Sequence, residues 1–320
     1  MSRQTVSNVI NAPDRVSDST RRQTEAAIAR LGYRRHAIAR SLRQRSSGLI
    51  GYRVPPAQRG AIHPVLDRFL HAVTAAASAD GNSVLLFVPD EAADEAAVHE
   101  EMLGTRTVDG LVLTNTTRED PRIEFLARRD LPFVSFGRTE LDVEHSWVDV
   151  DGAAGTRTAT DHLVRRGHRR IAYVGLATQL TFAFDRQRGY ANALAAAGID
   201  VDPALEARIA EHIDAASDAT AKLLALDDPP TAVVAGSDVL AAGVIRAVRS
   251  ASMSVGADGF GVIGFDDSAL APLLSPPLTS VRQPLEETGR VLVKLLAGRI
   301  RGDAPEGVLL EPELVLRESA

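Results

Sequence analysis

Polar side chains near the start of the chain carry the donor and acceptor groups that nucleic-acid recognition uses. The segment SRQTVSNVIN places four of them opposite its two valines on a helix: Arg3, Gln4, Ser7 and Asn8. An arginine fork hydrogen-bonds guanine, side-chain amides pair with adenine, and hydroxyl groups bind phosphate oxygens. The pattern therefore predicts contact with base edges and phosphates. A polar helix face that is only solvated remains the alternative.

The charge distribution favours the first of these interpretations. Residues 1–47 hold ten arginines and three acidic residues, a net charge of +7, whereas the remainder holds 26 basic and 39 acidic residues, a net charge of −13. A basic arm on an acidic body indicates an anionic polymer as the partner of the arm and a different partner for the body. A solvated basic tail would give the same count.

Composition excludes several classes of protein. With 45% hydrophobic and 24% charged residues in 320, the chain can bury a full core and is long enough for about two domains. It has no cysteine, so it can form neither a disulfide framework nor a thiolate metal site. The first residues are polar, and no run of 18 apolar residues occurs. The sequence therefore predicts a cytoplasmic protein that does not contact a membrane.

From Ile50 onward, short apolar runs alternate with helical patterns, which is typical of βαβ units and parallel sheets. The predicted strands are 49–54, 84–88, 110–113, 132–136, 146–150, 171–175, 231–235, 260–264, 279–282 and 308–316. The predicted helices are 65–80, 93–103, 120–129, 153–166, 183–197, 215–226, 238–250 and 285–298. So many strands exceed one sheet of ordinary size, which favours an α/β fold of two doubly wound lobes with a cleft at their junction.

The first 47 residues contain no strand pattern. Ser2 can cap a short helix that Pro13 ends, and Ser17 can cap a second helix that Gly32 ends. The second helix has a narrow apolar face formed by Thr24, Ala27, Ile28 and Leu31. A third stretch, 36–42, has almost no apolar face, so we expect it to be helical only against a partner.

These motifs together resemble a known family. SRQTVSNVIN, VSDSTRRQTEAAIARLGY and IARSL are similar to the helix-turn-helix headpiece and hinge of the LacI/GalR family of bacterial transcriptional regulators. VDVDGAAGTRTATDHLVRRGHRRIAYVG, DRQRGYANAL, VIGFDD and PPLTSVRQP are similar to its effector-binding core. The resemblance covers nearly the whole chain. It implies a small all-α headpiece, apparently truncated at its start, followed by a two-lobed core like that of the periplasmic binding proteins.

For the headpiece, the resemblance implies a recognition helix near residue 3, with Arg3, Gln4 and Asn8 at base-reading positions. It places four further residues at backbone-contacting positions: Thr5, Ser7, Asn11 and Arg15. Leu42 matches the hinge leucine that wedges into the minor groove, with Ala39 packed nearby. Without the motif, Leu42 would be interpreted as a core leucine.

Two features depart from the family pattern. The scaffold helix that normally precedes the recognition helix is missing, so we expect either a start codon placed too late or weak DNA binding by this polypeptide. Arg34, Arg35 and His36 stand where the family commonly has proline and asparagine before the hinge. Hinge geometry and phosphate contacts are therefore less securely predicted there.

For the core, the resemblance implies that Arg186 and Asp266 hydrogen-bond the effector and that Ser237 occupies a position where relatives have asparagine. A guanidinium and a carboxylate across a cleft can bind vicinal hydroxyls, which predicts a sugar or polyol. Trp147, the only tryptophan, could stack on a sugar face or belong to the core. We expect Asp238 to cap the following helix.

Other motifs in the sequence do not indicate a functional site. Gly259–Gly264 matches G-x-G-x-x-G but lies within an apolar strand, which argues against a nucleotide site. His63 and Asn115 follow strands of the first lobe and are expected to be ordinary loop residues. Asp149 and Asp151 are expected to serve in strand-to-helix capping. The histidine spacings match no metal motif, so the sequence predicts no metal and no cofactor.

The sequence thus predicts a homodimeric transcriptional regulator, specifically a repressor of carbohydrate-use genes, that binds double-stranded operator DNA. Its operator affinity would change with a small-molecule effector, expected to be a sugar, and family habit favours release by an inducer. Residues 1–47 would form the partial headpiece and hinge helix, and 48–320 the effector-binding and dimerisation core. Lobe one would comprise 48–149 and 283–302, and lobe two 150–282 and 303–320. The rivals are a two-lobed sugar-binding protein without DNA binding and an α/β enzyme, for which no catalytic constellation is found.

Overall fold

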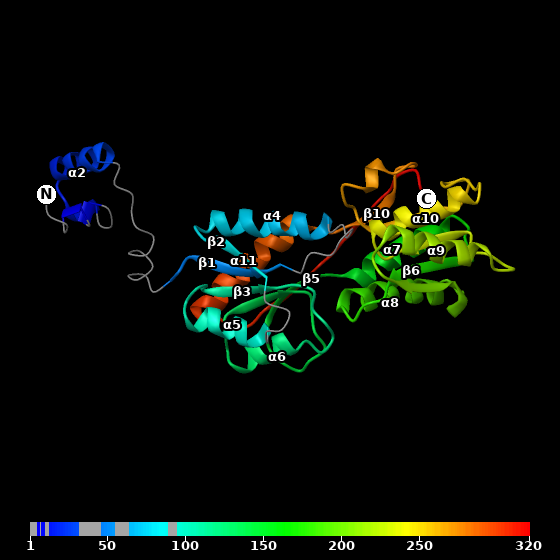
Figure 1. Ribbon diagram of the computed structural model, residues 1–320, viewed down its shortest axis with the longest axis horizontal. Helices are drawn as coiled ribbons and strands as arrows, with labels where there is room; N and C mark the ends of the chain where they lie inside the picture. The colour runs from blue at the N-terminus through cyan, green and yellow to red at the C-terminus, as the bar shows by residue number, and fades with distance from the viewer. Residues whose placement is uncertain (1–4, 7, 10–12, 32–45, 55–63, 89–94) are drawn as a thin grey trace. The chain divides into compact units, whose positions relative to one another are not determined.

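The computed structural model describes residues 5–6, 8–9, 13–31, 46–54, 64–88 and 95–320 (Figure 1). The chain divides into two compact units, Met1–Ser47 and Gly48–Ala320. Among the described residues, no helix is both long and apolar enough to cross a membrane.

The first unit contains the 3-10 turn η1 (Pro13–Arg15) and helix α2 (Asp18–Arg30). The predicted cap is confirmed, because the Ser17 hydroxyl accepts a hydrogen bond from the backbone N–H of Thr20 at 3.4 Å. Thr24 is fully buried, as a residue on the apolar face should be. Leu31, expected on the same face, is 74% exposed because it lies at the C-cap, where the helical periodicity ends.

The sheet of the first lobe has the strand order β11-β5-β4-β3-β1-β2 within the described chain, and every described pairing is parallel. Its strands are β1 (Leu49–Arg53), β2 (Ser83–Phe87), β3 (Gly110–Leu113), β4 (Phe133–Phe136), β5 (Ser146–Val150) and β11 (Gly307–Leu310). One face packs on α4 (Pro64–Ala79) and α11 (Leu285–Arg301), and the other on α5 (Glu95–Gly104) and α6 (Pro121–Arg128). Central strands covered on both faces are continuously apolar, as in the GLVL of β3.

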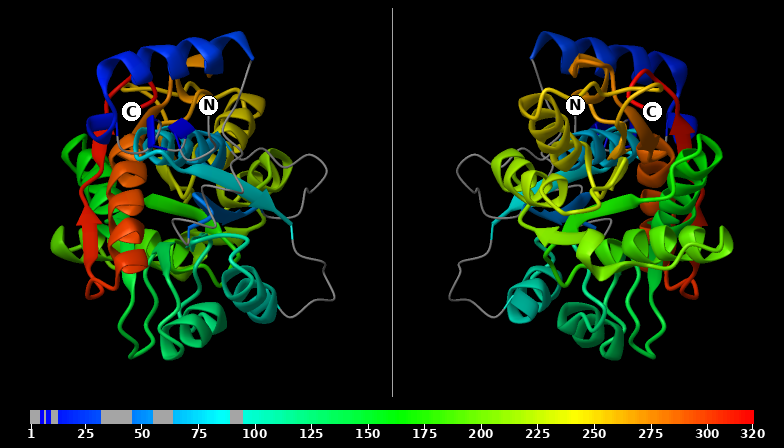
Figure 2. Two further views of the ribbon diagram at one scale, coloured as in Figure 1. Left: turned by 90° about the vertical axis from the view of Figure 1, so that its left-hand side faces the viewer. Right: turned by 90° about the vertical axis from the view of Figure 1, so that its right-hand side faces the viewer.

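The sheet of the second lobe has the order β12-β10-β9-β8-β6-β7, with only its edge strand β12 antiparallel among the described pairs. Its strands are β6 (Ile171–Leu176), β7 (Glu206–Ile209), β8 (Ala232–Ala235), β9 (Gly261–Asp266), β10 (Thr279–Arg282) and β12 (Glu313–Val315). Helices α7 (Gly152–Arg165) and α8 (Thr181–Ala196) pack on one face, and α9 (Ile213–Leu224) and α10 (Asp238–Ser250) on the other. Figure 2 shows helices on both sides of the strands of the lobes, with the edge strands β11 and β12, in red, on the outside.

The chain passes between the lobes three times within its described part: from β5 to α7, from β10 to α11, and from β11 to β12. Figure 1 shows the last two passages in orange and red. The structure corrects the assignment of 303–320 to lobe two, because β11 pairs with β5 in the first sheet and only β12 joins the second. The predicted strand 308–316 is therefore two strands. Pro312, which has no N–H to donate to a ladder, lies between them.

Candidate functional site

The carboxyl ends of the parallel strands in the two lobes face each other, as hydrogen bonds between the lobes show. After β3, the carbonyl oxygen of Thr116 accepts from the backbone N–H of Thr181 at 2.9 Å and from its hydroxyl at 3.3 Å. After β4, the Arg138 guanidinium donates to the Asp185 carboxylate at 2.7 Å. Ligands of open α/β sheets bind outside the carboxyl ends of strands. The lobe junction is therefore the candidate binding site.

Arg186 is the most constrained residue at this junction. It lies on α8 and is only 6% exposed. Its guanidinium lies between the rings of Phe182 and Phe265, at 4.7 and 3.7 Å from their centroids. Nη1 donates to the carbonyl oxygen of Gly236 at 2.6 Å, and Nη2 donates to Asp266 at 3.3 Å. Nε is buried and has no hydrogen-bond partner among the described residues, so its N–H is unsatisfied in this arrangement.

Asp266 ends β9 and faces Arg186. Its carboxylate also accepts a hydrogen bond from the Gln283 side-chain amide at 2.7 Å. Burial raises the pKa of Asp266, while the positive charge of Arg186 opposes that rise. The backbone of Asp266 has φ +112, a conformation that L side chains rarely adopt. A strained residue with a perturbed pKa at a junction is a candidate binding group.

Ser237 is buried beside this pair but acts locally. Its hydroxyl caps α10, accepting from the backbone N–H of Leu240 at 3.3 Å. The expectation that Asp238 caps the helix is wrong, because Ser237 holds that position. The Asp238 carboxylate instead accepts from the Ser280 hydroxyl and from the Ser268 backbone N–H, both at 2.6 Å, and so braces the ends of β9 and β10.

Trp147 is half-buried on β5, in the first lobe. A Cβ on Gly307 would lie 2.2 Å from its ring, so the indole covers the backbone of β11. The Arg138 guanidinium lies 5.9 Å from the ring centroid. The structure thus brings Arg186 and Asp266 together with the turn that carries Ser237, whereas Trp147 contacts the β11 side of the first sheet.

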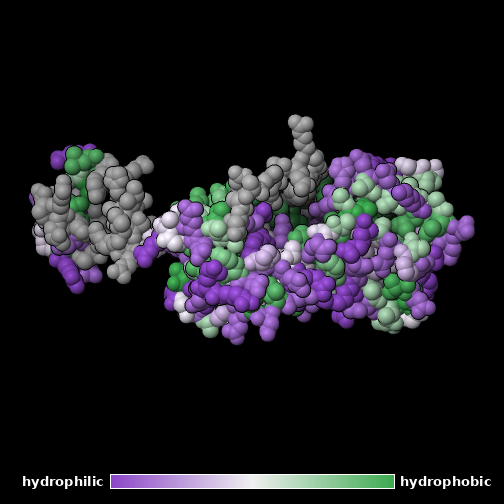
Figure 3. Space-filling view, turned by 60° about the horizontal axis from the view of Figure 1, so that its bottom comes forward, coloured by the Kyte–Doolittle hydropathy of each residue, from purple (hydrophilic) through white to green (hydrophobic). Residues whose placement is uncertain are grey.

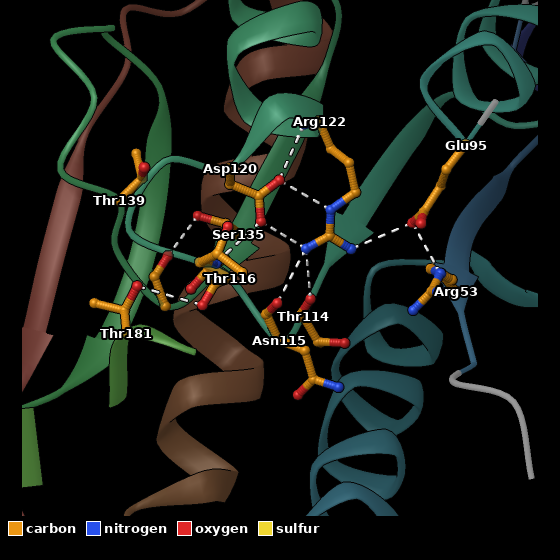
Figure 4. A network of polar contacts seen from close by, with 12 residues as sticks. Arg53, Glu95, Thr114, Asn115, Thr116, Asp120, Arg122, Ser135, Thr139 and Thr181 are labelled. Atoms are coloured by element: carbon orange, nitrogen blue, oxygen red, sulfur yellow. Dashed lines mark hydrogen bonds and ion pairs between the residues drawn. The ribbon is translucent and has the colours of Figure 1, made fainter. Parts of the chain in front are cut away.

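The loop from β3 to α6 is held by a charge network that sequence reasoning missed (Figure 4). Arg122 donates to the Asp120 carboxylate at 2.7 Å and to the carbonyl oxygens of Thr114 and Asn115, each at 3.1 Å. It also contacts Glu95 at 3.2 Å, which in turn pairs with Arg53 at 2.8 Å. Glu95 and Arg53 lie on α5 and β1, so no local spacing could have indicated their part in the network. Asn115 itself has φ +55.

Asp151 and Asp149 behave differently. Asp151 caps α7 as expected, accepting from the backbone N–H of Ala154 at 2.8 Å. The same expectation is wrong for Asp149, which pairs with Arg138 at 2.8 Å. Among the described residues, no group of three or more acidic or histidine side chains is placed to hold a metal.

A separate cavity of about 290 Å³ lies in the first lobe, where β4 and β5 begin. Two of its lining side chains have partners: Arg299 pairs with Asp130, and the His145 ring contacts the hydroxyl of the neighbouring Ser135 at 3.1 Å. None of the described side chains that line it is a buried polar group without a hydrogen-bond partner, so the lobe junction is the stronger candidate.

In the first unit, Thr5 and Asn8 are helical and half-buried, and Arg15 is exposed at the end of η1. Val9, predicted to be on the apolar side of this helix, is 6% exposed. Six other predicted DNA-contacting residues, and His63, lie outside the described residues: Arg3, Gln4, Ser7, Asn11, Ala39 and Leu42.

Two family models match the chain. The model described as "Bacterial regulatory proteins, lacI family" matches residues 1–36, and the one described as "Periplasmic binding protein-like domain" matches residues 160–320. The chain is 34% identical to the HTH-type transcriptional regulator CelR of Thermobifida fusca, over 99% of this chain and 94% of CelR. It is 30% identical to the HTH-type transcriptional repressor CytR of Escherichia coli K12, over 98% of this chain and 92% of CytR.

Solved structures of regulators in this family are also similar to the chain. A CelR–cellobiose complex has a TM-score of 0.77 and 33% identity, covering 100% of this chain and 96% of that chain. The Lac repressor dimer bound to operator and the anti-inducer ONPF has a TM-score of 0.85 and 27% identity, covering 99% and 94%. The fold and junction define a two-lobed ligand-binding core joined to a helix-turn-helix unit. The chain belongs to the LacI family of bacterial regulatory proteins and is a DNA-binding transcriptional regulator.

Proposed function

We propose that this regulator represses carbohydrate-use genes and that a sugar or polyol bound at the lobe junction releases it from its operator. The observation that carries the proposal is the buried Nε of Arg186, which has no partner among the described residues although the other guanidinium nitrogens and Asp266 are hydrogen-bonded. A sugar hydroxyl can accept from the guanidinium while its neighbour donates to a carboxylate. The solved complex of the related CelR with cellobiose supports a sugar as the ligand class.

For the DNA side, we propose that Arg3, Gln4 and Asn8 read bases. Thr5, Ser7, Asn11 and Arg15 would contact the backbone, and Leu42, with Ala39 beside it, would wedge into the minor groove. We propose a cytoplasmic homodimer, since two headpieces on a pseudo-palindromic operator require paired chains. We further propose that the protein catalyses no reaction. The match of residues 1–36 to a DNA-binding family argues against a sugar-binding protein without DNA binding.

The test combines binding to promoter DNA from the protein's own locus with direct sugar binding. Calorimetry measures the affinity for cellobiose and for a panel of mono- and disaccharides. Fluorescence anisotropy of labelled DNA measures operator affinity as each sugar is added. Asp266→Asn should weaken binding of the active sugar at least tenfold, about 1.4 kcal/mol, and leave sugar-free operator affinity within about twofold.

Asp202→Asn is the matched control, because Asp202 pairs with Arg170 at 3.4 Å and is partly exposed within the second lobe. It should bind the same sugar as the parent protein does. A dose curve for Asp266→Asn that coincides with that of Asp202→Asn would refute the effector site, and operator binding that ignores every sugar would refute the regulated function.

A further inference from the structure

Arg138 joins the two lobes through one guanidinium. Its Nε donates to the Asp149 carboxylate at 2.8 Å, and its Nη2 donates to the Asp185 carboxylate at 2.7 Å. Asp149 lies on β5 in the first lobe, whereas Asp185 lies on α8 in the second. A single planar group therefore bridges two carboxylates that belong to different lobes.

Both carboxylates are buried and fixed on their own lobes. Asp149 and Asp185 are 6% and 5% exposed. Asp149 also accepts from the backbone N–H of Val150 at 2.8 Å, and Asp185 also pairs with Arg188 at 2.5 Å. Burial raises the pKa of Asp149, and the hydrogen bond and charge of Arg138 oppose that rise. Because charge-assisted hydrogen bonds lose strength quickly with distance and angle, the bridge is satisfied only within a narrow range of lobe positions.

The bridge lies beside a passage between the lobes. The chain crosses from β5 into α7 just after Asp149, and a Cβ on Gly152 in this passage would lie 3.3 Å from the Arg186 side chain and 3.7 Å from that of Asp185. Rotation of the lobes about this passage would change the Arg138–Asp185 distance. It would leave the Arg138–Asp149 distance unchanged, since both residues belong to the first lobe.

A second contact across the junction is uncharged. Thr181 donates twice to the carbonyl oxygen of Thr116 (Figure 4). Leu180 forms an isolated antiparallel bridge with Thr117. Arg122 fixes the loop that presents this carbonyl oxygen. Breaking an ion pair that contains a buried carboxylate is costly, so lobe movement that separates Arg138 from Asp185 is opposed.

We propose that Arg138 is a positioning residue whose ion pair with Asp185 holds the lobes in the arrangement described here and sets their opening equilibrium. Asp185 immediately precedes Arg186 on α8. A ligand that moves Arg186 therefore moves Asp185 relative to Arg138, which connects the junction to the relative position of the lobes. This connection to a ligand rests on the proposed function, but the effect on the lobes does not.

The chain has no native cysteine, so two introduced cysteines can be spin-labelled without background. Glu101→Cys on α5 and Asp218→Cys on α9 are exposed positions in different lobes. Pulsed electron–electron double resonance on the 320-residue chain, without ligand, gives the interlobe distance distribution. Asp185→Asn should shift the ratio of distance populations about fivefold, since it removes the charged bond between the lobes.

Asp149→Asn is the matched control, because it is equally buried and contacts the same guanidinium but lies within the first lobe. It should leave the distribution unchanged. Arg138→Gln should reproduce the effect of Asp185→Asn, and the double variant should show no further shift, as expected for partners in one interaction. Equal effects of Asp149→Asn and Asp185→Asn, or no effect of either, would overturn the inference.

Should Asp185→Asn not fold, which circular dichroism would show, Arg138→Gln and Arg138→Lys give the same readout. The two proposals can fail separately. Distances that respond as expected in a protein whose operator binding ignores sugars would overturn only the proposed function. Distances that do not respond in a protein that sugars do release from DNA would overturn only the role of Arg138.

Discussion

Some buried polar side chains at the lobe junction and in the first lobe have all of their hydrogen-bonding atoms paired, and others do not. Asp120 and Arg122 satisfy each other and the loop around them. Nε of Arg186 and both ring nitrogens of His99 in the first lobe are buried and have no hydrogen-bond partner among the described residues. A buried polar group without a hydrogen-bond partner lowers the free energy of unfolding. We therefore expect such residues to affect either ligand binding or stability.

Because His99 is buried, we expect the protein to lose stability in mild acid. Its side chain is fully buried, its ring lies edge-on to Phe87 at 5.7 Å, and Arg122 is nearby. Burial lowers the pKa of His99 to about 4; Glu95 opposes this, and Arg122 adds to it. The unfolded chain binds this proton below about pH 6.5 and the folded chain only near pH 4, so stability is complete above 6.5 and declines as pH falls through this window. The decline is at most about 3 kcal/mol.

Urea unfolding at pH 7.5 and pH 5 measures this decline. His99→Met should flatten the pH dependence, since it removes the titrating group while retaining apolar volume. His71→Gln alters an exposed histidine on α4 and should follow the parent protein. If His99→Met and the parent lost the same free energy on acidification, another group would be responsible.

At this scale, sequence similarity could place Arg186 and Asp266 but not their surroundings. The bond between Arg138 and Asp185 joins residues in different lobes, so no spacing or periodicity encodes it. Ser237 and Asp238 are adjacent and either side chain can cap a helix; only the path of the chain into α10 decides between them.

At the scale of elements, the packing of α7 against α8 depends on the absence of a side chain at Gly189. A Cβ there would lie 2.1 Å from the carbonyl oxygen of Ala153, a distance that no real Cβ contact shows. Gly189→Ala must therefore separate two helices that flank the junction. We expect a loss of about 2–4 kcal/mol of unfolding free energy from overpacking.

Thermal and urea unfolding of Gly189→Ala measure this loss. Gly104→Ala is the matched control, because Gly104 is also helical and a Cβ there would meet no atom within 4 Å. It should be neutral or slightly stabilising, since alanine favours helix more than glycine does. Equal stability of the two variants would show that α7 and α8 can separate without cost.

Periodicity predicted most strands and helices of the core because buried parallel strands are continuous apolar runs between amphipathic helices. It missed β7, whose sequence EARI alternates charged and apolar residues at a sheet edge. It merged β11 and β12, since their apolar residues are nearly continuous and only the topology shows that they belong to different sheets. Length and hydrophobicity do not reveal which sheet a strand joins.

At the scale of the whole molecule, the two units have opposite charges. Residues 1–47 carry +7 and the remainder −13. The face of the lobes in Figure 3 is largely hydrophilic, with apolar residues in scattered patches. An acidic body repels a polyanion, so attraction to DNA must come from the first unit, whereas a buried junction should bind an uncharged sugar without regard to ionic strength.

This contrast predicts different salt dependences for the two binding reactions of one protein. Between about 50 and 200 mM salt, operator affinity should fall by about 10³–10⁵, as for a dimer that makes about 6–10 phosphate contacts. Over the same range, the affinity for the active sugar should change less than about twofold. Fluorescence anisotropy with labelled operator and calorimetry with the sugar measure both quantities in the same buffers. Operator binding that is indifferent to salt would mean that the arginines of residues 1–47 do not contact phosphates. Sugar binding that fell as steeply as operator binding would place the ligand among exposed charges, away from the buried Arg186.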